Sequence, residues 1–163
     1  MNPLELNGTP LENLAQAGLE LPSVAAPVAS YVPAVQTGNL VYTAGQLPFI
    51  DGALKETGVV SDQPDAEISP EVAANAARIA CLNALAAIDD LVGLNNVVRV
   101  VKVTGFVASE TGFTGQPGVI NGASELLGRV FGEAGQHARS AVGVNQLPLN
   151  SPVEVELIVE VAG

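Results

Sequence analysis

Residues that hold metals, disulfides or nucleic acids are scarce in this chain. It has one cysteine, Cys81, so an intramolecular disulfide is impossible, and one histidine, His137, so the usual zinc ligand sets are excluded. Six Lys and Arg residues are scattered singly among seventeen Asp and Glu, which gives a net charge of −11. Binding to nucleic acid or to anionic membrane surfaces needs clustered cations, so we expect neither partner. With the usual zinc ligand sets excluded, we also expect no metal site.

Long hydrophobic runs are also missing. Residues 1–5 lack the basic and apolar regions of a signal peptide, and no uncharged apolar run reaches the roughly 20 residues of a membrane span. Tryptophan is absent, and the 48% of apolar residues are mostly Ala and Val. We expect a cytoplasmic protein with a core of small side chains, and part of the apolar surplus on a subunit interface.

The hydrophobic patterns predict a short N-terminal helix followed by an α/β domain. Thr9, Pro10 and Glu12 form a capping box that starts a helix over 10–17, within an N-terminal extension of residues 1–26. The single domain, 27–163, is predicted to contain strands at 31–35 and 40–44, a loop at 51–68, a helix at 70–92, a strand at 97–107, a helix at 117–134, and strands at 139–146 and 153–161. This order predicts a mixed sheet with two long helices packed on one face, and the bare pattern makes the last two strands a hairpin.

Arg139 begins a predicted strand whose two faces differ. Val142 and Val144 point to one side, while Arg139, Ala141 and Gly143 point to the other. Small neighbours leave room for a ligand, and a guanidinium can hold a carboxylate through two hydrogen bonds. An exposed arginine at a strand end that contacts only water is the alternative.

Other polar residues give weaker indications of a site. Glu154 lies on the acidic side of the alternating strand 153–161, where it is either a solvated residue or a group that activates a water. Tyr31 either packs against the hairpin or closes a pocket with its hydroxyl. Asn121, early in a helix, either contacts a ligand or a neighbouring subunit, or is a tolerated polar residue. His137 is interpreted as a surface or interface residue, because no nucleophile pattern accompanies it.

Several segments, which follow one another along the chain in the family's order, together resemble the YjgF/RidA family over about residues 27–161. The Ala-Arg-Ser, Leu-Pro and Val-Glu-Val-Glu motifs near the end are the most specific. The segments are Tyr31–Val35, Gly38–Pro48, Val98–Val107, Ala138–Val144, Leu147-Pro148 and Val153–Glu156.

The resemblance implies a chorismate-mutase-like fold, in which the last strand inserts between earlier ones, and a homotrimer with clefts between neighbours. It also implies a cofactor-independent hydrolase of the endoribonuclease L-PSP-like group that deaminates enamines and imines to 2-oxo acids and ammonia. In that group Arg139 corresponds to the carboxylate-binding residue and Glu154 to the acid that positions water. The implied substrate-binding positions are Tyr31, Gly45, Asn121 and Ala141.

Three positions depart from the family pattern and keep other functions open. Ala141 replaces a common cysteine, Ala44 a frequent serine, and Gly143 an acid. These changes motivate an alternative, a non-catalytic trimer that binds small carboxylates or regulates another protein. RNA cleavage, attributed to some relatives, is a third reading that the acidic charge opposes.

Overall fold

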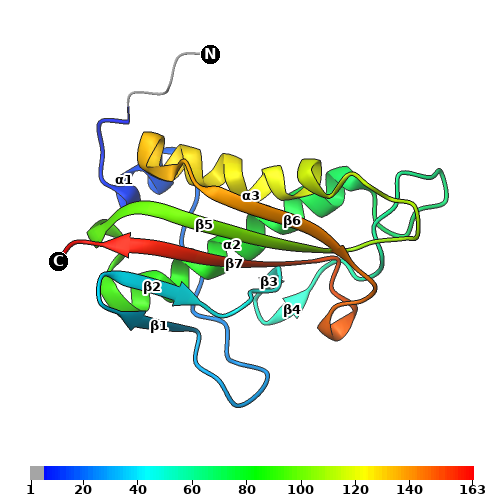
Figure 1. Ribbon diagram of the computed structural model, residues 1–163, viewed down its shortest axis with the longest axis horizontal. Coiled ribbons are helices and arrows are strands. Elements are labelled where there is room, and N and C mark those ends of the chain that lie inside the picture. Colours follow the sequence, from blue (N-terminus) through cyan, green and yellow to red (C-terminus); the bar gives the residue numbers. More distant parts are fainter. Residues whose placement is uncertain (1–5) are drawn as a thin grey trace.

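A mixed five-stranded sheet carries two long helices on one of its faces (Figure 1). This computed structural model describes residues 6–163. Its main strands are β1 (Ala34–Thr37), β2 (Leu40–Thr43), β5 (Val97–Ala108), β6 (Ala138–Val144) and β7 (Val153–Val161), and its helices are α1 (Pro10–Gln16), α2 (Pro70–Val92) and α3 (Gln116–Phe131). The minor elements are β3 (Phe49–Ile50), β4 (Ala53–Leu54), and the 3-10 turns η1 (Leu94–Asn96), η2 (Gly132–Gly135) and η3 (Pro148–Asn150). The predicted mixed sheet with two helices on one face is confirmed.

The strand order β1-β2-β7-β5-β6 places β7 in the middle of the sheet. β5 and β6 are parallel neighbours, whereas β7 pairs antiparallel with both β2 and β5. The predicted hairpin of β6 and β7 is therefore wrong, and the insertion implied by the family resemblance is confirmed. Every second residue of β7 is buried, from Val153 to Val161. Because β7 lies in the centre of the sheet, both edges of this apolar strand are paired with neighbouring strands.

Two short hairpins differ from the predicted boundaries. β1 and β2 are joined by only two residues, with Gly38 at φ 56°, so Thr37 pairs with Leu40 and Tyr31 lies in the loop before β1. The predicted 51–68 loop begins with another two-residue turn, Asp51-Gly52, in which both residues have positive φ and join β3 to β4. These strands have two residues each, too short for a periodic signal.

Helix α2 is the core helix of the fold. Its N-cap is Ser69, whose hydroxyl accepts a hydrogen bond from the Val72 backbone N–H, and Pro70 follows in the first turn. By length and composition α2 could also cross a membrane, but 61% of the apolar 18-residue stretch on which that assessment rests is buried within this fold. Its apolar character is explained by packing between the sheet and α3.

The close packing of α3 on α2 depends on Gly122. A Cβ atom at this position would overlap the backbone oxygen of Ala74 on α2, so only glycine allows this approach. At the far end of α3, the Asn13 side chain of α1 donates to the backbone oxygen of Val130 at 2.8 Å, and Leu14 enters the core. The N-terminal segment from α1 onward is thus attached to α3 (Figure 1).

Candidate functional site

Arg139 projects from the edge strand β6 toward the helices. It pairs with Val103 of β5, which is fully buried under the helices, and residues paired across neighbouring strands share a face. Ala141, two residues further along β6, lies on the same side and packs against the core. The structure therefore places Arg139 and Ala141 together on the helix side of the sheet.

The guanidinium of Arg139 is held by polar groups of α3. Nη1 donates to Asn121 Oδ1 at 2.8 Å and to Ser124 Oγ at 3.2 Å, and Nη2 donates to the backbone oxygen of Pro117 at 3.3 Å. These bonds leave Nε–H and one Nη2–H without a partner among residues 6–163. Nε–H lies on the edge of the guanidinium that it shares with Nη2, and an edge of this kind can form two parallel bonds to a carboxylate.

His137 belongs to the same network, which the sequence did not reveal. Its Nε2 lies 2.9 Å from Ser124 Oγ, and its Nδ1 lies 2.6 Å from the backbone oxygen of Gly135. The available signal was weak: Asn121 and Ser124 are three residues apart on a helix and therefore share a face, but nothing in the pattern linked that face to His137.

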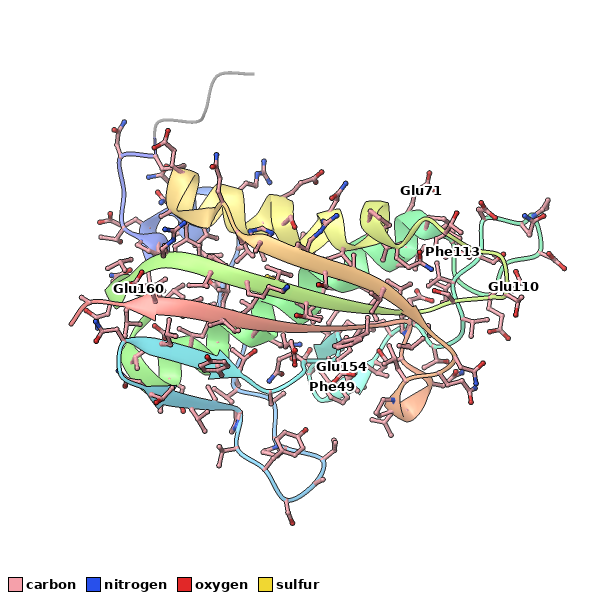
Figure 2. The ribbon with its side chains drawn as sticks, in the orientation of Figure 1. Phe49, Glu71, Glu110, Phe113, Glu154 and Glu160 are labelled. Atoms are coloured by element: carbon pink, nitrogen blue, oxygen red, sulfur yellow. The ribbon has the colours of Figure 1, made fainter. Side chains whose placement is uncertain are left out.

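Glu154 lies on the opposite, open face of the sheet. It pairs with Phe106, and its neighbour Val155 points into the core. The side chain is partly buried, and Figure 2 shows it on the half of β7 away from Glu160. Burial, with a smaller contribution from the charge of Glu156, raises the pKa of the Glu154 carboxyl. A carboxyl group of this kind is suited to exchange protons with a reacting molecule.

Gly45 sits against Glu154 where the pairing of β2 with β7 is interrupted. The Thr43 hydroxyl accepts from the Leu157 backbone N–H at 2.9 Å, and pairing resumes at Gln46, which exchanges backbone hydrogen bonds with Val155. A Cβ atom at Gly45 would overlap the Glu154 carboxylate. The glycine therefore leaves room for this carboxylate beside the strand.

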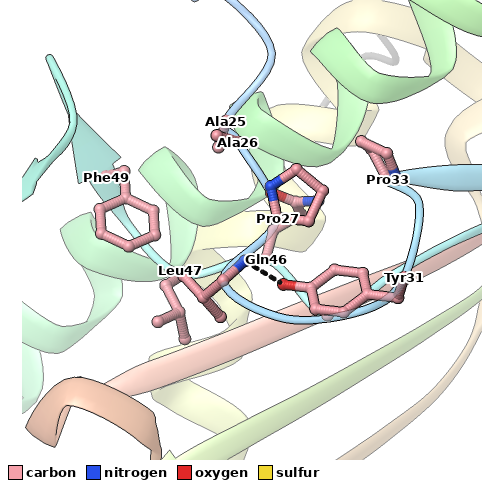
Figure 3. Close-up of a pocket in the computed structure, with 10 residues that line it drawn as sticks. Ala25, Ala26, Pro27, Tyr31, Pro33, Gln46, Leu47 and Phe49 are labelled. Carbon is pink, nitrogen blue, oxygen red and sulfur yellow. Dashed lines mark hydrogen bonds between the residues drawn. The ribbon is translucent and has the colours of Figure 1, made fainter.

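Tyr31 and Gly45 line one small cavity (Figure 3). The Tyr31 hydroxyl accepts a hydrogen bond from the Val28 backbone N–H at 3.3 Å, which holds the ring over the loop before β1. The enclosed volume is about 20 Å³, which is the space of a single water molecule. A cavity of this size has no room for a substrate on its own.

The proposed site residues thus form two groups on opposite faces of one sheet. Arg139, Asn121 and Ala141 lie on the helix side, whereas Glu154 with Gly45 lies on the open side, near the loop that carries Tyr31. Among the described residues 6–163, no three His, Cys, Asp or Glu side chains gather in a way that would hold a metal ion. A single copy of the chain brings the members of each group together but keeps the two groups apart.

The open face of the sheet also exposes apolar side chains. Val35 is 52% exposed, Tyr42 39% and Val142 43%, on β1, β2 and β6 respectively. Register places them on the same side as Glu154, together with the half-buried Phe106. A patch of this kind on an otherwise well-packed subunit is typical of a protein interface.

A broader groove of about 1000 Å³ runs along the outer side of α2 and α3. Asn121 lines it together with Arg78, Glu125 and Arg129. The groove has charges of both signs and faces away from the sheet. Neither Arg139 nor Glu154 lines this groove, so it does not connect the two groups of site residues.

Comparisons with known proteins agree with the fold. A family model described as "YjgF/chorismate_mutase-like, putative endoribonuclease" matches residues 12–161. The chain is 41% identical over 156 residues to Protein TCP17 of Trypanosoma cruzi, covering 94% of this chain and 95% of that protein. A structure titled as a putative endoribonuclease from Shewanella oneidensis MR-1 superposes with a TM-score of 0.89 at 34% identity, covering 94% of this chain and all of that one. RidA from the Antarctic bacterium Psychrobacter sp. PAMC 21119 gives a TM-score of 0.60 at 27% identity, over 85% and 94% of the two chains.

Proposed function

Because the chain belongs to the YjgF/RidA family, we propose that it hydrolyses small 2-imino acids, and the enamines in equilibrium with them, to 2-oxo acids and ammonia. The observation that carries this proposal is the guanidinium of Arg139, which α3 holds through Nη1 and Nη2 while Nε–H, on the edge it shares with Nη2, is unpaired among residues 6–163. A small carboxylate fits that edge. The substrate class is therefore defined by its carboxylate and by an electrophilic carbon beside it.

In this proposal the carboxylate anchors the substrate and Glu154 handles the proton transfers. Water adds to the C2 carbon of the protonated imine, and Glu154 accepts a proton from that water as the C–O bond forms. The proton then passes from Glu154 to the amino nitrogen. The C–N bond breaks as the hydroxyl oxygen forms the C=O bond and gives up its proton, and the departing ammonia takes up that proton, so the products are a 2-oxo acid and an ammonium ion. The imine is already electrophilic, so the chain's own residues need only hold the substrate, place one water and move protons.

A second copy of the chain would complete the site. Arg139 and Glu154 of one subunit face opposite sides of the same sheet, so one substrate cannot reach both. The exposed apolar patch around Val142 and Tyr42 lies on the Glu154 side and needs a cover. We therefore propose a homotrimer in which the Arg139 edge of one subunit meets the Glu154 face of its neighbour.

A binding protein without turnover is the second candidate. Ala141 and Gly143 give the helix side of β6 no functional group besides Arg139, and Ala44 gives none beside Gly45. This composition favours holding a carboxylate over reacting with it. RNA cleavage is less compatible with the chain, because the net charge of −11 repels phosphates.

The proposed activity is tested with 2-iminopropanoate, made in situ by an amino-acid oxidase and trapped with semicarbazide. Wild-type protein is expected to lower the trapped signal by consuming the imine. Arg139→Lys keeps the charge but loses the planar two-donor edge, so kcat/KM should fall on the order of 100-fold. Arg129→Lys, on the outer surface of α3, is the matched control and should behave as wild type.

The outcomes separate the two candidates. Consumption of the imine that depends on Arg139 but not on Arg129 supports the deaminase. Saturable binding of pyruvate with no consumption of imines of any side chain supports the binding protein. Equal activity of wild type and Arg139→Lys would refute the role assigned to Arg139.

A further inference from the structure

We propose that His137 is a positioning residue that fixes Arg139 through the hydroxyl of Ser124. His137 follows η2, Ser124 lies on α3 and Arg139 lies on β6, so the three side chains tie three elements together. The inference rests on the proposed carboxylate-binding role of Arg139. It adds two residues to that site, neither of which touches the substrate.

The backbone determines which nitrogen of His137 carries the proton. Nδ1 lies 2.6 Å from the backbone oxygen of Gly135, and a carbonyl oxygen only accepts, so Nδ1 must donate. In the neutral ring Nε2 is then an acceptor. The bond of 2.9 Å between Nε2 and Ser124 Oγ therefore has the Ser124 hydroxyl as its donor.

This bond directs the lone pairs of Ser124 toward Arg139. A serine within a helix can turn its hydroxyl back to a carbonyl of its own helix. Here the hydroxyl hydrogen points to His137 instead, and the oxygen accepts from Arg139 Nη1 at 3.2 Å. Asn121 accepts from the same Nη1 at 2.8 Å, so the two acceptors together hold this end of the guanidinium.

Holding Nη1 determines which edge of the guanidinium faces outward. With Nη1 bound to Ser124 and Asn121, and Nη2 bound to the Pro117 carbonyl, rotation about the Nε–Cζ bond would break three hydrogen bonds. The edge formed by Nε and Nη2 is then presented in one orientation before the carboxylate arrives. Such preorganisation improves affinity because less side-chain freedom is lost on binding.

The network is tested first by nuclear magnetic resonance, which needs neither substrate nor turnover. In wild type at about pH 8, where imidazole groups are usually neutral, we expect separate Nη1 and Nη2 resonances for Arg139, because rotation is slow. Arg139→Lys identifies these resonances by their loss. The chain's one histidine gives an unambiguous ring spectrum, in which Nδ1 should carry the proton.

Three variants then separate positioning from general structure. His137→Phe and Ser124→Ala remove the acceptor and the hydroxyl, and should merge the Arg139 Nη resonances. His137→Gln can still accept from Ser124 through its side-chain oxygen, and should keep them separate. The same series should raise KM for the imine, or the Kd for pyruvate, about 10-fold for His137→Phe but less than about 2-fold for His137→Gln, with kcat changing less than KM.

The results distinguish this inference from the proposed function. Separate Nη resonances in His137→Phe, or merged ones in folded wild type, would overturn the role of His137 whatever the activity. Resonances that follow the expected series in a protein that binds no pyruvate and consumes no imine would support the network and refute the proposed function.

Discussion

At Glu154, a carboxyl group is partly buried beside a second carboxyl group. Burial is the larger cause of its raised pKa and Glu156 the smaller. The ionised form is therefore less favourable in the folded chain than in the unfolded chain. The folded state is penalised above the raised pKa, and the penalty disappears below the ordinary value of 4.5, where both states are protonated.

Unless a cation of a neighbouring copy offsets this charge, Glu154→Gln should therefore stabilise the protein at high pH only. The neutral amide avoids the cost of a buried charge, so Tm should rise at about pH 8 and be unchanged at about pH 4. Glu160→Gln, on the same face at the other end of β7, is the control (Figure 2). A lower Tm of Glu154→Gln at pH 8 would instead indicate that a cation of a second copy faces this carboxylate.

The sequence predicted some of the site residues but not all of the contacts between them. Arg139 and Asn121 were singled out by their places in the predicted strand and helix and then by the family resemblance, and the structure joins them by a hydrogen bond of 2.8 Å. The contact of His137 with Ser124 could not be predicted, because it depends on how η2 ends against α3. Such contacts between elements leave no periodic trace in the sequence.

Among the helices, the crossing of α2 and α3 is the tightest contact that a single substitution can test. Gly122→Ala would push a methyl group into the Ala74 backbone oxygen, which cannot move away as a side-chain end could. We expect the free energy of unfolding to fall by about 1–3 kcal/mol, measured by urea denaturation.

Gly128→Ala on the same helix is the matched control. Nothing lies within 4 Å of a Cβ atom built at Gly128, so alanine should only improve helix propensity. This variant should gain about 0.5–1 kcal/mol. Equal effects of the two substitutions would show that the α2–α3 contact does not depend on Gly122.

The strands show what periodicity determines and what it leaves open. The alternation in 153–161 correctly predicted which β7 residues face the core. It could not predict which strands lie on either side, because adjacency in the chain favoured β6 while the α3 crossover made β6 parallel to β5. The short β3–β4 hairpin was missed because two-residue strands carry no alternation.

For the whole molecule, the separation of the two groups of site residues predicts complementation between inactive variants. In the proposed homotrimer, Arg139→Lys and Glu154→Gln each damage a different side of every site between subunits. When the two variants are coexpressed, random trimers should contain intact sites at about a quarter of their interfaces, so about a quarter of wild-type activity should return.

The control is to mix the same two variants after each has been purified and assembled separately. Slow exchange of subunits should keep that mixture inactive at first. No recovery on coexpression, in trimers verified by their mass, would mean that Arg139 and Glu154 do not act on one substrate between two copies.

The central position of β7 also has a consequence for protein synthesis. Residues 153–161 pair with both β2 and β5, which are made much earlier. Until this segment has left the ribosome, both strands have an unpaired inner edge, and unpaired edges favour aggregation. The nascent chain therefore keeps its sheet in two parts until residues 153–161 have been translated, and a chain truncated before them would expose both unpaired edges.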